Sequence, residues 1–163
     1  MSGAGAPDLS VDATGLRVAI IAGSWHGEIM EHLVAGAQHS ISAAGAEHET
    51  FTVAGGFELP LAAQIALAPR ETGGGGYDAA VCLGIVIRGG TPHFEYISSA
   101  VTDGLTRVQL DAGKPIGFGV LTTDTEQQAL DRSGRPGAPE SKGREAAEAA
   151  LHLAVALRRI ASS

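Results

Sequence analysis

The chain has 163 residues, a formal net charge of −7 and a single cysteine, Cys82. The length fits one domain, expected to span residues 1–163, and the acidic balance argues against broad nucleic-acid binding. A lone cysteine excludes a disulfide within the chain and makes a cysteine-based metal site implausible; we predict that Cys82, which lies in an apolar run, is a small buried core residue.

Residues 1–15 show no regular apolar pattern, and we expect them to form an irregular N-terminal arm. The first ten residues lack the basic-then-apolar order of a signal peptide. No apolar stretch approaches the ~18 uninterrupted residues of a membrane span. We therefore expect a soluble, cytoplasmic protein with no membrane partner.

The first half of the chain alternates apolar runs with segments of helical spacing. Residues 16–23 form a short β-branched run, which predicts a buried strand. Apolar residues recur at helical spacing over residues 29–41 and predict a helix that ends near Gly45. Residues 48–56 are expected to form a second strand, and residues 58–68 a short helix.

A glycine run at residues 73–76 predicts a short flexible loop. Residues 77–88 are then almost continuously apolar, as expected of a strand that is covered on both faces. The helix that follows is marked by one apolar face, formed by Phe94, Ile97, Val101, Leu105 and Val108.

Residues 114–123 predict a fourth strand. Thr123 and Glu126 have the spacing of a capping box, which predicts a helix that runs to about Ser133. A loop separates this helix from a last helix, which Ser141 is expected to cap.

The strict alternation of strands and helices predicts an α/β fold, with a four-stranded parallel sheet and helices on both faces. Ligands of such sheets bind beyond the carboxyl ends of the strands. Candidate site residues are therefore sought in four segments: residues 23–26, 55–58, 88–93 and 119–124.

The segment "RGGTPH", residues 88–93, follows the third predicted strand. Gly89 and Gly90 allow a ligand to approach bare backbone N–H groups, and Thr91 opens a helix whose N-terminus attracts anions. A phosphate site is one interpretation, and an ordinary strand-to-helix turn is the other. His93, in the first turn of that helix, is either a residue that exchanges protons or a capping or packed side chain.

Trp25 is the only tryptophan, and it follows the first predicted strand instead of joining the apolar stripe of the next helix. Its ring can stack on a planar heterocycle at the mouth of a site, or it can be a packing anchor. In "GGFELP", residues 55–60, Glu58 can accept hydrogen bonds from ligand hydroxyls. The alternative role for Glu58 is to satisfy the first turn of the short helix.

Two cations near the end of the chain are further candidates. Arg132 lies near the end of a short helix, where a solvated cation is common, and Lys142 follows in "SKG". The other histidines show neither i,i+4 pairing nor an HExxH pattern, which argues against a zinc site. We interpret most of them as surface residues: His26, His32, His39, His48 and His152.

Five segments together carry a resemblance: "GSWHGEI", "GGFELPLAAQ", "GIVIRGGTPHFEYI", "GVLTTDTEQQALDRSG" and "SKG". In this order and spacing the chain resembles the 6,7-dimethyl-8-ribityllumazine synthases, especially the actinobacterial members with tryptophan after the first strand. The resemblance implies a flavodoxin-like three-layer sandwich. It also implies the penultimate reaction of riboflavin biosynthesis, in which 5-amino-6-(ribitylamino)pyrimidine-2,4-dione condenses with 3,4-dihydroxy-2-butanone 4-phosphate, and for which no cofactor or metal is required.

The resemblance also implies a role for each candidate residue. The residues expected to contact the pyrimidine and its ribityl chain are Trp25, Gly56, Phe57, Glu58, Ile85, Val86 and Ile87, the last three through their backbone. The residues expected at the phosphate are Gly90 and Thr91, with His93 moving protons. A neighbouring subunit would supply Phe118, which closes the pocket, and Arg132, which binds the phosphate. Lys142 would lie near the ribityl chain.

The loop before the last helix bears on the oligomeric state. Members of the family form pentamers, paired pentamers or icosahedral shells, and the shell formers have a short linker at this place. Here "GRPGAPES", residues 134–141, is longer and holds two prolines. The resemblance therefore implies a homopentamer, with the N-terminal arm adding a strand to a neighbour's sheet. The choice between pentamer and decamer, and any association with riboflavin synthase, stay open.

Proteins of other classes can share this architecture. A response regulator needs acidic residues beyond its first strand, where this chain has Gly-Ser-Trp, and an acceptor aspartate at its third strand, which here ends in Arg88. A flavodoxin needs a Ser/Thr-rich phosphate loop after the first strand. A non-catalytic flavin- or lumazine-binding relative stays open as an alternative. A scaffold has no evident use for Glu58, His93 and Arg132 together.

Overall fold

The structure is a computed structural model, and it describes residues 7, 9–70 and 76–163. Most of the predicted glycine loop lies outside the described residues, as do residues 1–6 and 8 of the expected arm. The described residues before the first strand form neither helix nor strand. Ala13 is buried and donates its N–H to the carbonyl of Ala44 at 2.8 Å, so this part of the arm packs against the end of the first helix.

Strands and helices alternate along the chain as predicted. The strands are β1 (Arg17–Gly23), β2 (Glu47–Val53), β3 (Ala79–Ile87) and β4 (Ile116–Thr123). The helices are α1 (Gly27–Ala43), α2 (Leu59–Leu67), α3 (His93–Ala112), α4 (Glu126–Leu130) and α5 (Lys142–Ala161), with a 3-10 turn, η1 (Gly56–Glu58), before α2.

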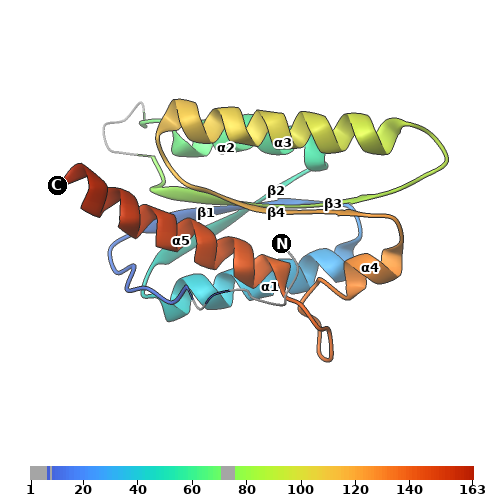
Figure 1. Cartoon of the computed structure of the whole chain (residues 1–163), viewed down its shortest axis with the longest axis horizontal. Coiled ribbons are helices and arrows are strands. Elements are labelled where there is room, and N and C mark those ends of the chain that lie inside the picture. The colour runs from blue at the N-terminus through green and yellow to red at the C-terminus, as the bar shows by residue number, and fades with distance from the viewer. Residues whose placement is uncertain (1–6, 8, 71–75) are drawn as a thin grey trace.

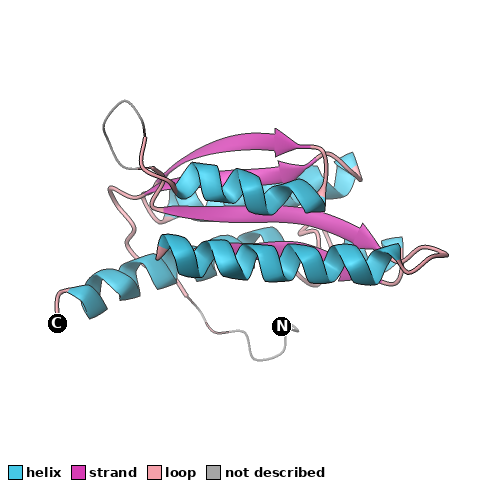
Figure 2. Ribbon diagram, turned by 90° about the horizontal axis from the view of Figure 1, so that it is seen from above, coloured by secondary structure: helices cyan, strands magenta, loops and turns pink. Residues whose placement is uncertain are grey.

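The predicted α/β sandwich is confirmed. The four strands pair in parallel in the order β2-β1-β3-β4, and the visible arrowheads point the same way (Figure 2). Helices α2 and α3 cover one face of the sheet, and α1, α4 and α5 cover the other (Figure 1). This order matches the first four strands of flavodoxin-like sheets, in which ligands bind where the order reverses, beside β1 and β3.

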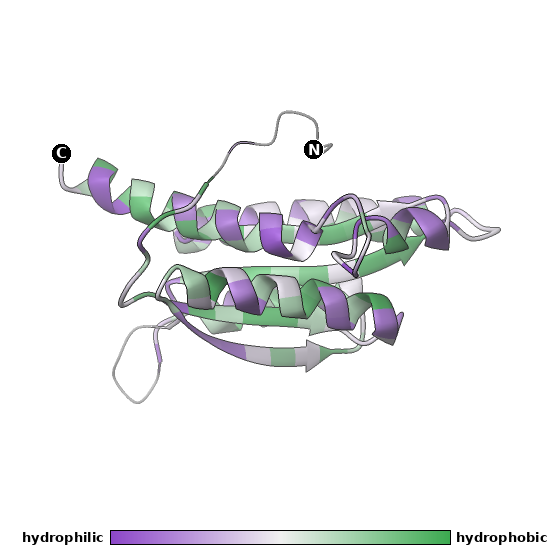
Figure 3. Ribbon diagram, turned by 90° about the horizontal axis from the view of Figure 1, so that it is seen from below, coloured by the Kyte–Doolittle hydropathy of each residue, from purple (hydrophilic) through white to green (hydrophobic). Residues whose placement is uncertain are grey.

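Burial explains the contrast between the central and edge strands. β3 is buried from Ala79 to Val86, which accounts for its continuous apolar run. β2, at one edge, leaves most of its residues exposed and carries the polar sequence EHETFTV. The strands are mainly hydrophobic, and hydrophilic residues lie on the outward faces of the helices (Figure 3).

Several boundaries differ from the prediction because of local turn chemistry. β2 ends at Val53 instead of residue 56, because η1 begins at that glycine. Thr123 does not cap α4, since it is the last residue of β4 and pairs with Ile87. Thr125 is the cap instead, and its hydroxyl accepts a hydrogen bond from the N–H of Gln128 at 3.2 Å.

Helix α4 ends at Leu130 and not near Ser133. The Ser133 hydroxyl donates to the Leu130 carbonyl at 2.8 Å, and a local bond of this kind competes with continuation of the helix. Ser141 does occupy the position before α5, but its side chain makes no capping hydrogen bond within the described chain.

Two hydrophobic cores fill the space on the two sides of the sheet. The core against α1 and α5 depends on very small residues. A Cβ added to Gly143 in α5 would lie 2.7 Å from the carbonyl carbon of Leu33 in α1, and one added to Gly117 in β4 would lie 2.9 Å from that of Ala146 in α5. Helix α5 therefore packs almost backbone to backbone against both α1 and β4.

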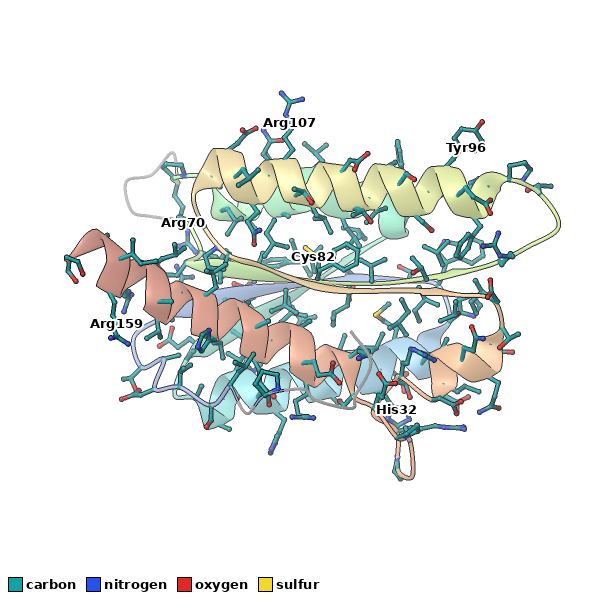
Figure 4. All side chains as sticks on the ribbon, in the orientation of Figure 1. His32, Arg70, Cys82, Tyr96, Arg107 and Arg159 are labelled. Carbon is teal, nitrogen blue, oxygen red and sulfur yellow. The ribbon has the colours of Figure 1, made fainter. Side chains whose placement is uncertain are left out.

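Cys82 lies in the other core, between the sheet and the layer of α2 and α3 (Figure 4). Burial raises the pKa of its thiol to about 12. Because the thiolate is the reactive form, we expect no alkylation of the folded protein by iodoacetamide over hours at pH 8. The same reagent should label Cys82 fully in guanidinium chloride. Stoichiometric labelling of folded protein, followed by mass spectrometry, would show that the thiol is accessible and the expectation wrong.

No helix within the described residues is both long and apolar enough to cross a membrane. The described residues also contain no group of three His, Cys, Asp or Glu side chains arranged to hold a metal ion.

Candidate active site

The carboxyl ends of β1, β2 and β3 lie at one edge of the sheet. On one side of β1, its last residue Gly23 pairs with Val53, the last residue of β2. On the other side, β1 pairs with β3, and this pairing ends at Leu83 of β3. β3 runs on to Ile87, and among the described strands its residues 84–87 pair with β4 only. The backbone of β3 that faces β1 is thus open at its end. The open part holds the three residues predicted to border the ring, Ile85, Val86 and Ile87.

Trp25 stands beside this opening, in the turn after β1. Its side chain is 68% exposed, which a packing anchor would not be. A Cβ added to Gly55 would lie 3.2 Å from Cδ1 of the indole, so the ring lies close over the turn after β2. The Ser24 hydroxyl donates to the Val53 carbonyl at 2.7 Å and ties the two turns together. One face of a large aromatic ring is therefore presented at the edge of the site.

The turn after β2 brings its predicted residues to the same place. Oε2 of Glu58 accepts a hydrogen bond from the N–H of Gly55 at 2.8 Å, so this carboxylate does satisfy the first turn, as the structural alternative predicted. Glu58 and Phe57 are both exposed and can still meet a ligand. A Cβ added to Gly56 would lie 3.9 Å from Cγ2 of Val86, which places this turn against the end of β3.

The turn between β3 and α3 holds the predicted phosphate residues. Gly90 and Thr91 are exposed, and no atom of the described residues lies within 4 Å of the Cβ that Gly90 would carry. Pro92 precedes the first turn of α3, and exposed His93 is the first residue of this 20-residue helix. The free N–H groups of such a helix end attract anions. The turn can therefore receive a phosphate group directly beside an imidazole.

Arg88 is the main feature of this turn that sequence analysis did not single out. Its Nε donates to Oδ1 of Asp124 at 2.7 Å, its Nη1 pairs with Glu95, and its guanidinium lies 4.2 Å from the ring centroid of Phe94. Hydrogen bonds to Asp124 and then to Glu95 raise the pKa of Arg88, and its hydrogen bond lowers the pKa of Glu95. The sequence feature that could have pointed to Arg88 is a basic residue directly after an apolar strand.

The remaining predicted residues form a second group along the other edge strand. Phe118, Arg132 and Lys142 line a cavity of about 370 Å³ between β4 and the segment that joins α4 to α5. Nη1 of Arg132 donates to the carbonyl of Gln128 at 2.9 Å, an arrangement typical of a helix-end cation. Arg132 also faces this cavity, so both interpretations of it are compatible with the structure.

Lys142 is held by two carboxylates that sequence analysis missed. Its Nζ lies 2.6 Å from Oε2 of Glu140 and 2.8 Å from Oε2 of Glu145, and its side chain is 15% exposed. Burial lowers the pKa of Lys142, but these two hydrogen bonds outweigh burial and raise it overall. The bond from Lys142 lowers the pKa of Glu140. Lys142 is therefore a fixed positive charge at the wall of the cavity.

The structure thus brings the predicted residues together in two groups and not in one. The cavity beside β4 is lined by residues of β4, Arg132, Glu140 and Lys142, and it does not include Trp25, Glu58 or His93. The first group lies at the carboxyl ends of β1, β2 and β3, at the other side of β3. Within the described residues, the cavity beside β4 is therefore separate from the first group.

A third region is large and apolar. A cavity of about 1130 Å³ runs along β2 and α2, and its lining includes Phe51, Phe57, Leu61 and Ile65. Leu61 and Ile65 are large apolar side chains that are mostly exposed. Contiguous exposed apolar surface of this kind is typical of a protein–protein interface.

Comparisons with known proteins agree with one another. The family model described as 6,7-dimethyl-8-ribityllumazine synthase matches residues 15–158. The protein of that name from Leifsonia xyli subsp. xyli (strain CTCB07) is 59% identical over 162 residues, which cover 98% of this chain and 99% of that protein. Those from Clavibacter michiganensis subsp. michiganensis (strain NCPPB 382) and Kineococcus radiotolerans are 54% and 53% identical, with at least 97% of each chain covered.

Proposed function

The chain belongs to the 6,7-dimethyl-8-ribityllumazine synthase family, and we propose that it catalyses the condensation of 5-amino-6-(ribitylamino)pyrimidine-2,4-dione with 3,4-dihydroxy-2-butanone 4-phosphate. This transferase reaction is the penultimate step of riboflavin biosynthesis. One observation carries the assignment to this edge of the sheet. The open end of β3 has an exposed indole on one side and an anion-attracting turn on the other, as one planar and one phosphorylated substrate require.

The pyrimidine would lie at the end of β3 with Trp25 stacked on its ring. The backbone of Ile85 and Ile87 would supply donors and acceptors for the polar edge of the ring, because no described strand pairs with this part of β3 on that side. Val86 lies between them, and its own backbone groups face β4, as those of Ala80 and Arg88 do. The turn of Gly56, Phe57 and Glu58 would hold the ribityl chain, whose hydroxyls suit a carboxylate acceptor.

The second substrate would place its phosphate at Gly90 and Thr91. Its ketone then faces the amine of the pyrimidine, and the two form an imine with loss of water. Phosphate is eliminated next, the ring closes and a second water leaves. These steps need protons moved at several atoms, and His93 follows the proposed phosphate residue Thr91 by two positions, so it would supply them.

We propose that the active site is completed by a neighbouring subunit. The second group, with Phe118, Arg132 and Lys142, would face the first group of the next copy. The separation of the two groups in one chain and the exposed apolar surface along β2 and α2 support this arrangement. The loop between α4 and α5 projects from the layers (Figure 1), and with its two prolines it favours a free homopentamer. We expect the enzyme to act in the cytoplasm.

Arg132→Ala is expected to raise the KM for butanone phosphate by about 10–100-fold, since charge-assisted hydrogen bonds contribute roughly 1.5–3 kcal/mol. The KM for the pyrimidine should change little. The measurement follows lumazine formation by absorbance with each substrate varied in turn. Arg159→Ala is the control, because Arg159 is exposed in the last turns of α5, away from both groups (Figure 4). A change confined to the pyrimidine KM would remove Arg132 from the phosphate site.

Mixed oligomers test the shared site directly. Subunits with His93→Ala and subunits with Arg132→Ala should be weakly active alone, the latter at limiting butanone phosphate. After joint refolding, about one site in four should combine an intact His93 with an intact Arg132 if neighbours pair at random around a ring. Recovery of activity to roughly that fraction supports the arrangement. Activity equal to the average of the two variants would place both residues in one subunit's site.

If wild-type protein forms no lumazine above the uncatalysed rate, the non-catalytic alternative replaces this proposal. A yellow protein with the absorbance of a bound flavin or lumazine would then identify a binding relative.

A further inference from the structure

Arg88 connects three parts of the chain that meet beside the site. It follows the last residue of β3, and its N–H donates to the carbonyl of Thr123 at 2.9 Å, which extends the sheet by one residue. Its guanidinium reaches Glu95 in the first turn of α3 and Asp124 in the turn after β4. The same guanidinium lies over the ring of Phe94. One side chain thus joins the end of β3, the first turn of α3 and the turn between β4 and α4.

The turn between Arg88 and α3 has little other support from side chains. Apart from the chain neighbours of each glycine, no atom of the described residues lies within 4 Å of the Cβ positions that Gly89 and Gly90 would carry. The contacts of Arg88 reach Phe94 and Glu95, which follow His93 directly. They therefore restrain the first turn of α3, and with it the backbone N–H groups and the imidazole that the proposed reaction uses.

The geometry of Arg88 is that of a structural bridge. A guanidinium is planar and presents its donors in a fixed fork, so it can hold two carboxylates in defined directions at once. Here Nε is directed to Asp124 and Nη1 to Glu95. Two negative charges against one positive charge also leave this cluster unsuited to attract a further anion.

We propose that Arg88 is a positioning residue: by bridging Glu95 and Asp124 it fixes the glycine turn and His93 in the geometry that the reaction needs. This inference rests on the proposed synthase activity for its kinetic consequence. The restraint of the turn is independent of that activity and can be measured without substrate.

The kinetic test compares Arg88→Met and Arg88→Lys with Arg107→Gln. Arg107 lies on α3, the helix that Arg88 contacts through Glu95, points away from the sheet (Figure 4) and pairs with Asp111 at 3.4 Å, which makes it a matched control. Since misplacement by about 1 Å can cost about 10²-fold, Arg88→Met should lower kcat by about 10–100-fold with both KM values changed by less than ~3-fold. The kcat of Arg88→Lys should lie between those of Arg88→Met and wild type, and the kcat of Arg107→Gln should equal that of wild type. A raised KM for butanone phosphate with unchanged kcat would make Arg88 a phosphate ligand and overturn the proposal.

Asp124→Ala gives a second test, because a positioning role and a phosphate-binding role for Arg88 predict different kinetic changes. If Arg88 positions the turn, loss of Asp124 should lower kcat in the same way, and the double variant Arg88→Met/Asp124→Ala should be no slower than Arg88→Met. If Arg88 binds phosphate, loss of a competing carboxylate should lower the KM for butanone phosphate. Additive losses in kcat would also overturn the proposal, because they would show that the two residues act separately.

Hydrogen exchange of the free, full-length protein separates failure of this inference from failure of the proposed function. Arg88→Met should speed exchange of the amides of Glu95 and Tyr96, which donate to the Pro92 carbonyl in the first turn of α3, by about 10-fold or more, and Arg107→Gln should not. Unchanged exchange at these two amides overturns the proposal whatever the enzyme does. Faster exchange in a protein whose wild type makes no lumazine would uphold the restraint and reject the synthase reaction.

Discussion

We expect His93→Ala to slow turnover by about 10²-fold or more, the range of a positioned acid or base, while leaving activity above the uncatalysed rate. Condensation of an amine with a ketone proceeds in water near neutral pH. Much of the acceleration should therefore come from holding two substrates together, where effective molarities are large. That contribution does not depend on His93, which is the first residue of α3, after the turn of Gly90 and Thr91.

The measurement is kcat with both substrates saturating, because a proton-transfer role appears there and not in KM. His152→Ala is the control, since His152 is exposed on α5 and belongs to neither group. Added imidazole should restore part of the lost rate in His93→Ala and none in wild type. An unchanged kcat would remove His93 from the mechanism.

The largest effect on stability is expected from Gly143→Ala. The new methyl group would overlap the carbonyl of Leu33, 2.7 Å from its carbon, and both partners are backbone in packed helices. Overpacking costs typically 1–3 kcal/mol and sometimes more, and we expect the upper end because no flexible side chain can move aside. For a chain of this size about 3 kcal/mol lowers Tm by about 6–12 °C. Gly143 directly follows Lys142, so a shift of the backbone at Gly143 should also displace Lys142 and lower kcat/KM.

Gly27→Ala is the matched control for that variant. Gly27 is the first residue of α1, and no atom of the described residues lies within 4 Å of the Cβ that it would gain. The Tm of Gly27→Ala should stay close to that of wild type or rise slightly, because alanine is a better helix former than glycine. Equal Tm values for wild type and Gly143→Ala by calorimetry would mean that α1 and α5 separate without cost, which contradicts the close packing described above.

Much of the fold could be predicted from sequence, because its dominant signal is local. The apolar run of β3 and the helical spacing of α1 and α3 each reflect burial of that same segment. The errors lie where neighbouring residues compete for the same hydrogen bonds. Thr123 and Thr125 both precede a glutamate or glutamine at a suitable distance, and pairing of Thr123 with Ile87 in the sheet decides between them.

The site was predictable only in part. Strand ends and exposed motifs singled out Trp25 and the turn before His93 as candidates, because parallel strands bring such segments to one edge. Asp124 lies at the end of one of the searched segments, but nothing in the sequence pairs it with Arg88, which is 36 residues away. The role of Gly143 was missed for a similar reason. The space around a glycine depends on which helix packs against it.

Three glycines in α5 or packed close to it also limit how the stability of this protein can be increased. At Gly117, Gly119 and Gly143, an added side chain meets the backbone of Ala146, the side chain of Leu83 and the backbone of Leu33, respectively. Glycine has no smaller replacement, so every substitution at these three positions adds volume where none is free. Stabilising libraries should keep them fixed and vary exposed positions on the helices, where a new side chain meets solvent.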